Sequence, residues 1–178
     1  MQTDDERYIG MREFSRVDAH IPLEIYRVPP DKREGIRSKI SGEAFPAEMR
    51  ALPDLDDKLL TDWLKMLNAK LDALIGMLVL QREGFCSLSL ADVNISGGGM
   101  SFTSRERYGI GEVLELKMML PLLPPVALHA YGEVVKEELL ADGCRSAVKF
   151  IAMEEEIRDE IVKFVFKRQR DILREMRK

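Results

Sequence analysis

The stretch Asp92-Val93-Asn94-Ile95-Ser96-Gly97-Gly98-Gly99-Met100-Ser101-Phe102 contains the clearest indication of the fold in this chain of 178 residues. Its first five residues end one β segment, and Met100–Thr103 forms the next. Three consecutive glycines between them are typical of a tight turn whose backbone needs positive φ, which glycine adopts without steric cost. The stretch therefore predicts two strands joined by a glycine turn.

Residues 84–151, on both sides of this turn, have the pattern of an all-β region. Phe85 and Ser87 alternate with Cys86 and Leu88, as they would in a strand that begins before the turn. Further strands are expected at Met100–Thr103, Val113–Leu120, Val126–Lys136 and Arg145–Ile151, with turns at Gly109 and Gly111 and a hairpin tip at Ala141-Asp142-Gly143. Short strands at regular spacing predict a sandwich or a barrel.

Two more strands are expected near the start of the chain. Ala19–Val28 carries apolar residues at alternating positions, and Pro29-Pro30-Asp31 ends it. Ile36–Ser41 is a candidate second strand that stops at Gly42.

Residues 53–81 differ in kind, because they predict a long helix. Pro53 followed by Asp54 is a helix-start pattern, and Asp56 and Asp57 suit the positive end of the helix dipole. Leucines then recur at spacings of four and three, which is an a/d heptad seam: Leu60, Leu64, Leu67, Leu71, Leu74 and Leu78. We interpret this seam as the contact of a homo-oligomer formed through residues 55–80. The alternative is an ordinary amphipathic helix that lies on the barrel.

The tail 154–178 is expected to be a second helix, with acids at its start and basic residues at its end. Its basic residues suit a solvated face better than a nucleic-acid or lipid surface, because acids are interspersed among them.

Composition excludes several classes of protein. Hydrophobic residues make up 46% and charged residues 33%, as in a soluble globular domain. A net charge of −4 argues against a nucleic acid polymer as partner. The longest apolar run, Met118–Leu128, is too short and too rich in proline to span a bilayer, and the acidic N-terminus does not resemble a signal peptide. We therefore expect a cytoplasmic protein without membrane insertion.

Neither a cofactor nor an enzymatic activity is expected. Cys86 and Cys144 are far apart and are interpreted as reduced structural residues, while His20 and His129 have no metal-ligand spacing. The chain has no phosphate-binding G-x-x-x-x-G-K-[ST] loop and no G-x-S-x-G elbow.

Two short motifs remain, and each is weak alone. Arg12 and Arg16 stand four apart before the first strand, and Asn94, Ser96 and Gly99 form the glycine turn. Together, in this order and strand context, they resemble the R-x-x-x-R and [D/N]-x-S-x-x-G motifs of the PilZ domain family. The resemblance covers roughly residues 10–30 and 84–170.

The resemblance implies a single mainly β domain over residues 1–178. Its fold would be a six-stranded antiparallel split β-barrel of PilZ type, with residues 53–81 as an inserted helix and 154–178 as a C-terminal helix. It also implies a bacterial receptor for cyclic di-GMP.

The chemistry of the motif residues suits that ligand. Guanidinium groups pair with phosphate oxygens or with the O6/N7 edge of guanine, and asparagine suits a guanine edge. Ser96 supplies a short hydroxyl, and the glycines let the backbone approach an anion.

Two departures from the family pattern shape the expectation. Met11 stands where a third arginine would help to hold a stacked pair of ligands, so we expect one ligand per subunit. The inserted heptad segment is not general in the family. A second reading follows from it, namely a structural adaptor that oligomerises through the helix without needing nucleotide.

Overall fold

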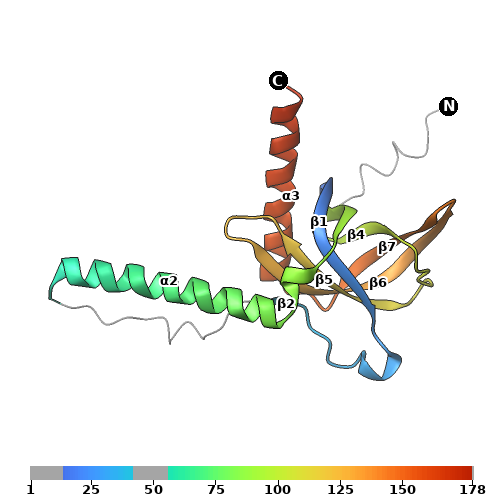
Figure 1. Ribbon diagram of the computed structural model, residues 1–178. Helices are drawn as coiled ribbons and strands as arrows, with labels where there is room; N and C mark the ends of the chain where they lie inside the picture. Colours follow the sequence, from blue (N-terminus) through green and yellow to red (C-terminus); the bar gives the residue numbers. More distant parts are fainter. Residues whose placement is uncertain (1–13, 42–55, 178) are drawn as a thin grey trace.

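The structure is a computed structural model that describes residues 14–41 and 56–177. Figure 1 shows a β-barrel from which two long helices extend in different directions. The prediction of a mainly β domain with an inserted helix and a C-terminal helix is confirmed for these residues.

Six strands close into an antiparallel barrel, and a short seventh strand is added to it. The strands are β1 (Arg16–Arg27), β2 (Lys39–Ser41), β3 (Leu90–Ser96), β4 (Gly99–Ser104), β5 (Val113–Leu120), β6 (Val126–Leu140) and β7 (Gly143–Ile151). The order β6-β5-β1-β3-β4-β7 returns to β6 because β6 also pairs with β7, and β2 pairs with residues 127–129 of β6. The predicted six-stranded antiparallel barrel is therefore confirmed.

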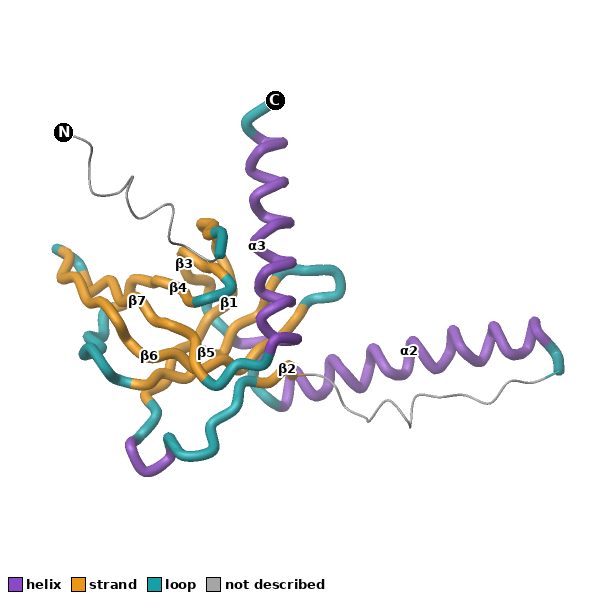
Figure 2. Tube along the Cα trace, turned by 180° about the vertical axis from the view of Figure 1, so that it is seen from behind, coloured by secondary structure: helices purple, strands orange, loops and turns teal. Residues whose placement is uncertain are grey.

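Alternating side chains fill the barrel. Val17, Ile21, Ile95, Leu116 and Leu128 are among the inward residues that are buried. The helix α3 (Glu155–Glu175) adds a buried apolar face to the same core, made of Ile157, Ile161, Phe164 and Val165. In Figure 2, α3 stands against the barrel and extends beyond it. α3 thereby also reaches the glycine turn and the start of β1, through Arg158 and Gln169.

The expectation of a strand at Phe85–Ser87 is wrong. These residues form a 3-10 helix, η4, and β3 starts only at Leu90. Gly84 turns the chain with a φ of 77°, and Phe85 is buried with its ring edge-on to His129 at 5.2 Å. Burial of one aromatic ring therefore outweighs the local alternation. Cys86 consequently lies in η4 rather than in a strand.

The other strands are largely where they were expected, with shifted ends. β5 matches its prediction, whereas β1 begins earlier because Arg16 pairs with Ser96 of β3. β6 and β7 run further, up to the tip of their hairpin. β2 is shorter than expected, since only Lys39–Ser41 pair with β6. A second 3-10 helix, η2 (Pro30–Lys32), follows β1 at the predicted proline stop.

The inserted helix α2 (Lys58–Arg82) starts later than predicted. Asp57 is its N-cap, because its side chain accepts a hydrogen bond from the Leu60 amide at 3.1 Å. Asp56 and Asp57 therefore precede the helix, and residues 53–55 lie outside the described part of the chain. The C-terminal helix also ends slightly inside its predicted bounds.

α2 extends away from the barrel (Figure 1), so the alternative of a helix lying on the barrel is wrong. All six leucines of the heptad seam are between 41% and 63% exposed. Trp63 and Met77 beside them are exposed as well. Most of the stability of helices in globular proteins comes from packing of an apolar face, and the described residues leave this seam uncovered.

A polar cluster attaches the C-terminal end of α2 to the barrel. The His129 ring lies between two carboxylates, with Nδ1 at 2.8 Å from Glu115 and Nε2 at 3.6 Å from Glu83. Burial raises the pKa of Glu83, but the neighbouring Ser41 hydroxyl and the charges of Lys39 and His129 outweigh burial and lower it below the usual value. The folded state therefore favours ionised Glu83.

Because the pKa of Glu83 is lowered by folding, its contribution to stability is present above the usual carboxyl range and is lost as the pH falls through the folded pKa. Glu83→Gln is expected to lower the midpoint of thermal unfolding at neutral pH and to cost less at an acidic pH below the usual carboxyl range. Thermal melts at both pH values test this, with the exposed Glu34→Gln as the control. A cost that is the same at both pH values would contradict the assignment.

Candidate functional site

The candidate residues of β1 and β3 lie on one outer face of the barrel. The antiparallel register sets Arg16 opposite Ser96, Asp18 opposite Asn94 and His20 opposite Asp92. The residues between them are the inward ones. Because side chains alternate along a strand, these three pairs form consecutive rows on the same side of the sheet.

The same face continues across β4 and β7. Ser101 of β4 stands opposite Asn94, and Gly99 stands opposite Ser96. On β7, Lys149 is the partner of Gly99 and Arg145 is the partner of Thr103. We call this surface of β1, β3, β4 and β7 the outer face. It brings together segments that are more than a hundred residues apart in sequence.

Ser96 stabilises the turn between β3 and β4. Its side chain is buried, with the residue 3% exposed, and its hydroxyl donates to the Gly99 carbonyl at 3.1 Å. The same oxygen accepts a hydrogen bond from the Gly98 amide at 3.3 Å. The hydroxyl predicted to meet a ligand is therefore already bonded within the turn, and it fixes the shape of the backbone there.

The glycines of the turn are required because neighbouring groups leave no room for a Cβ atom. None of Gly97, Gly98 and Gly99 has positive φ, so the expectation that the turn requires it is wrong. A Cβ on Gly99 would lie 2.2 Å from the Val148 carbonyl oxygen, and a Cβ on Gly97 would lie 2.8 Å from the Phe14 ring. Close approach of neighbouring groups therefore explains these glycines.

The helix α3 holds the start of β1 against the turn. Arg158 donates to the Gly97 carbonyl at 2.6 Å and places its guanidinium 5.5 Å from the centre of the Phe14 ring. Gln169 donates to the Arg16 carbonyl at 3.2 Å. These contacts position the backbone of Arg16 beside the glycine turn.

A cavity of about 340 Å³ opens on the outer face at this turn. Among the residues that the structure describes, Arg16, Ser96, Gly98, Gly99 and Lys149 line it together with Ser101 and apolar residues, and no carboxylate does. We call it the cationic cavity. Two cations next to exposed backbone suit a phosphate group.

A second cavity, of about 320 Å³, adjoins the first, because Ser101 lines both. We call it the mixed-charge cavity, since its lining includes Asp18, Asp92, Arg145 and Arg168 as well as Asn94. Asn94 Nδ2 donates to Asp18 Oδ1 at 2.8 Å. In the next row, His20 Nδ1 lies 2.7 Å from Asp92 Oδ1. Hydrogen-bonding groups of both kinds suit the edge of a base better than a second phosphate.

The structure thus brings Arg16, Ser96 and Gly99 to one cavity and places Asn94 in the adjoining one. Arg12 lies outside the described residues. The role of these residues in ligand binding stays a prediction.

Sequence reasoning did not single out Asp18, Arg145, Lys149 or Arg168, which line the same cavities. Asp18 comes two residues after Arg16 in β1. Because side chains alternate along a strand, this spacing indicates that Asp18 lies on the same face as Arg16. The other three come from β7 and α3, whose positions on the outer face are not apparent in the sequence.

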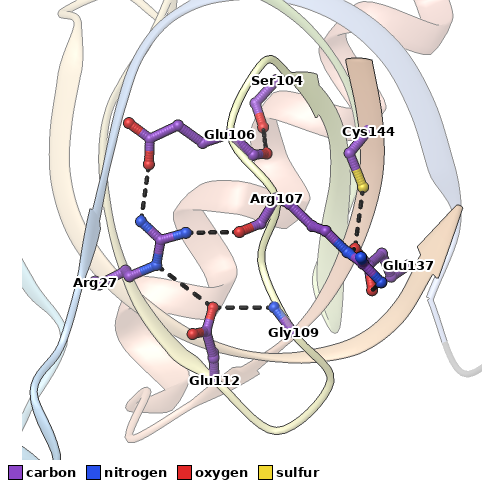
Figure 3. A network of polar contacts seen from close by, with 8 residues as sticks. All are labelled: Arg27, Ser104, Glu106, Arg107, Gly109, Glu112, Glu137 and Cys144. Atoms are coloured by element: carbon purple, nitrogen blue, oxygen red, sulfur yellow. Dashed lines mark hydrogen bonds and ion pairs between the residues drawn. The ribbon is translucent and has the colours of Figure 1, made fainter. Parts of the chain in front are cut away.

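A separate polar network serves the barrel itself. Figure 3 shows Arg27 of β1 between the side chains of Glu106 and Glu112, with Nη1 donating to Glu106 at 2.9 Å. Arg27 also donates to the Arg107 carbonyl at 2.6 Å, and Arg107 pairs with Glu137. The hydrogen bond from Arg107 lowers the pKa of Glu137. These paired charges fix the β4–β5 loop on the barrel wall.

A membrane-spanning helix and a metal-binding group are both absent from the described residues. No helix there is long and apolar enough to cross a membrane. No group of three or more His, Cys, Asp or Glu side chains in residues 14–41 and 56–177 is arranged to hold a metal ion.

Comparison with known proteins agrees with this architecture. The family model of the PilZ domain matches residues 78–167. No curated protein matches the chain in sequence.

Two solved structures share the fold. One is a PilZ domain protein from Xanthomonas campestris, described as a tetramer self-assembled via an unusual helical bundle; its TM-score is 0.58 at 17% identity, over 90% of this chain and 91% of that one. The other is the inhibitor of motility MotI/DgrA from Bacillus subtilis, with a TM-score of 0.51 at 13% identity, over 90% of this chain and 52% of that one. The chain therefore spans about half the length of MotI/DgrA.

Proposed function

The chain belongs to the PilZ domain family, whose members include receptors for cyclic di-GMP, and we propose that it is itself a cyclic di-GMP receptor. The ligand would bind on the outer face, with Arg12, Arg16, Asn94, Ser96 and Gly99 as the motif residues. A receptor for a bacterial second messenger acts where that messenger is made, so we place this chain in the cytoplasm.

One observation supports the proposal most. Arg16, Ser96 and Gly99 line a single cavity together with Lys149, and none of the described residues adds a carboxylate to its lining, although the chain as a whole has a net charge of −4. A local cationic site on an acidic protein suits a specific anion. The adjoining mixed-charge cavity then offers hydrogen-bonding groups to a base joined to that phosphate.

We further propose that the chain binds its ligand without transforming it. Both histidines are engaged by carboxylates, His20 by Asp92 and His129 by Glu115. Within the part of the chain that the structure describes, neither histidine is hydrogen-bonded to a serine or cysteine, as a base beside a nucleophile would be.

A second function is favoured by α2. Its exposed heptad seam suits self-association through residues 55–80, and the similar Xanthomonas protein is described as assembling via a helical bundle. We propose a homo-oligomer held by this helix. An adaptor that needs only the helix would have no use for the motif residues of the outer face, so the receptor is the better supported function.

Titration calorimetry with cyclic di-GMP tests the receptor. The parent chain is expected to bind one ligand per subunit and to prefer it over cyclic di-AMP. Arg12→Ala and Arg16→Ala should each weaken binding by about 10- to 150-fold, because each removes a charge-assisted hydrogen bond worth about 1.5–3 kcal/mol. Arg82→Ala, at an exposed arginine of α2, is the matched control and should bind as the parent does.

The same samples distinguish the receptor from the adaptor. Light scattering reports the oligomer while calorimetry reports the ligand. Binding that both arginine variants retain in full would refute the site, and a stable oligomer without affinity for the nucleotide would favour the adaptor.

A further inference from the structure

We propose that Asp18, which lies outside both sequence motifs, determines which base the receptor accepts. Asp18 and Asn94 together would bind the guanine edge that carries N1–H and N2–H. This inference rests on the proposed function and adds to it a residue that decides between guanine and adenine.

The two side chains form one unit on the outer face. They are cross-strand partners in β1 and β3, and both line the mixed-charge cavity. Asn94 Nδ2 donates to Asp18 Oδ1 at 2.8 Å, and this contact is exposed to solvent on the cavity side. A ligand in the cavity would therefore meet both groups at once.

The contact fixes what Asn94 can offer. An asparagine amide by itself presents a donor and an acceptor, and by turning over it can pair with adenine as well as with guanine. A carboxylate only accepts hydrogen bonds. Asp18 therefore holds the NH₂ group of Asn94 toward itself and leaves the Asn94 carbonyl oxygen as an acceptor for a ligand. Asp18 Oδ2 gives the same pair of side chains a second acceptor.

Two acceptors offered by one pair of side chains match guanine and oppose adenine. Guanine presents two donors side by side on its Watson–Crick edge, N1–H and N2–H. Adenine presents the N1 acceptor there, next to the N6 donor. A carboxylate facing adenine N1 would set two acceptors against each other, which leaves a polar pair unsatisfied. The pair of Asp18 and Asn94 is thus suited to reject cyclic di-AMP.

Because Asp18 is negatively charged, the direction of the change in affinity on its removal distinguishes two roles for it. If Asp18 were only a surface acid, it would repel a dianionic ligand, and its removal would strengthen binding. Asp92 provides that comparison, because it is an acid on the same face, lines the same cavity and contacts His20 instead of Asn94. The two acids differ mainly in their contact with the motif residue.

The experiment measures affinity for cyclic di-GMP and for cyclic di-AMP by calorimetry, in the parent, Asp18→Ala and Asp92→Ala. Asp18→Ala is expected to weaken cyclic di-GMP binding by about 10- to 100-fold, the loss expected for a hydrogen bond to a charged group. Its affinity for cyclic di-AMP should stay or rise, so the preference for guanine falls at least tenfold. Asp92→Ala should leave that preference unchanged. Circular dichroism confirms that each variant is folded.

Asn94→Ala gives a second readout, since it removes the other half of the pair and should also reduce the preference. If the parent binds cyclic di-GMP but Asp18→Ala keeps its preference, or binds both nucleotides more tightly, this inference is wrong while the proposed function stands. If the parent binds no cyclic di-GMP, both fail.

Discussion

Gly99→Ala is expected to destabilise the barrel by about 3 kcal/mol, at the upper end of the usual cost of overpacking. The new Cβ would lie 2.2 Å from the Val148 carbonyl oxygen, which belongs to the backbone of β7. A side chain can turn away from such a clash, whereas here β4 and β7 would have to separate. Their ladder of pairs from Gly99–Lys149 to Ser104–Cys144 contributes to closing the barrel.

Thermal unfolding measures this cost. For a chain of this size, about 3 kcal/mol corresponds to a fall of about 6–12 °C in the unfolding midpoint. Gly109→Ala is the matched control, because its Cβ would meet only Glu112 side-chain carbons at 3.9 Å. A Gly99→Ala variant as stable as the control would show that the two strands can part at little cost. It would also return the role of Gly99 to ligand binding alone.

Replacing Leu67 and Leu71 together by aspartate is expected to convert the proposed oligomer into monomers. Each buried leucine contributes about 1.5–3 kcal/mol to association, so loss of the pair should raise the dissociation constant by about 150-fold or more. The barrel should be unaffected, since both leucines are exposed on a helix that projects from it. Sedimentation or light scattering measures the mass.

Ala69→Asp with Ala73→Asp is the matched control for the seam. It adds the same two charges to exposed positions of α2 that lie off the heptad seam. This variant should keep the mass of the parent. A seam variant with unchanged mass, or a parent that is already monomeric, would contradict assembly through α2.

Much of the barrel could be predicted from the sequence, because apolar and polar residues alternate along β1 and β7 and turn residues separate the strands. The predicted bounds of β5 agree with the structure to the residue, and β6, β7 and β1 differ from their predictions mainly at their ends. Phe85–Ser87, which precede β3, are predicted as part of a strand but form the 3-10 helix η4. There, a buried ring at Phe85 and a positive φ at Gly84 decide the structure, and periodicity reports neither.

The site was less predictable than the fold. The motif spacing indicated Arg16, Asn94, Ser96 and Gly99, and the structure sets them on one face. The pairing of Asp18 with Asn94 depends on the register of β1 against β3. Arg145 and Arg168 come from elements whose approach to that face depends on barrel closure and on helix packing. Contacts of this kind join distant segments, so a local pattern does not encode them.

The projection of α2 has a consequence for whatever recognises this protein. Subunits joined along that helix would carry several identical barrels on one rigid stem, each with its own outer face. A target with repeated docking points would then be held at more than one place, and the second attachment would proceed at an effective concentration of about millimolar. Weak binding of the target by one barrel would become tight binding by the oligomer, without any additional contact within a subunit.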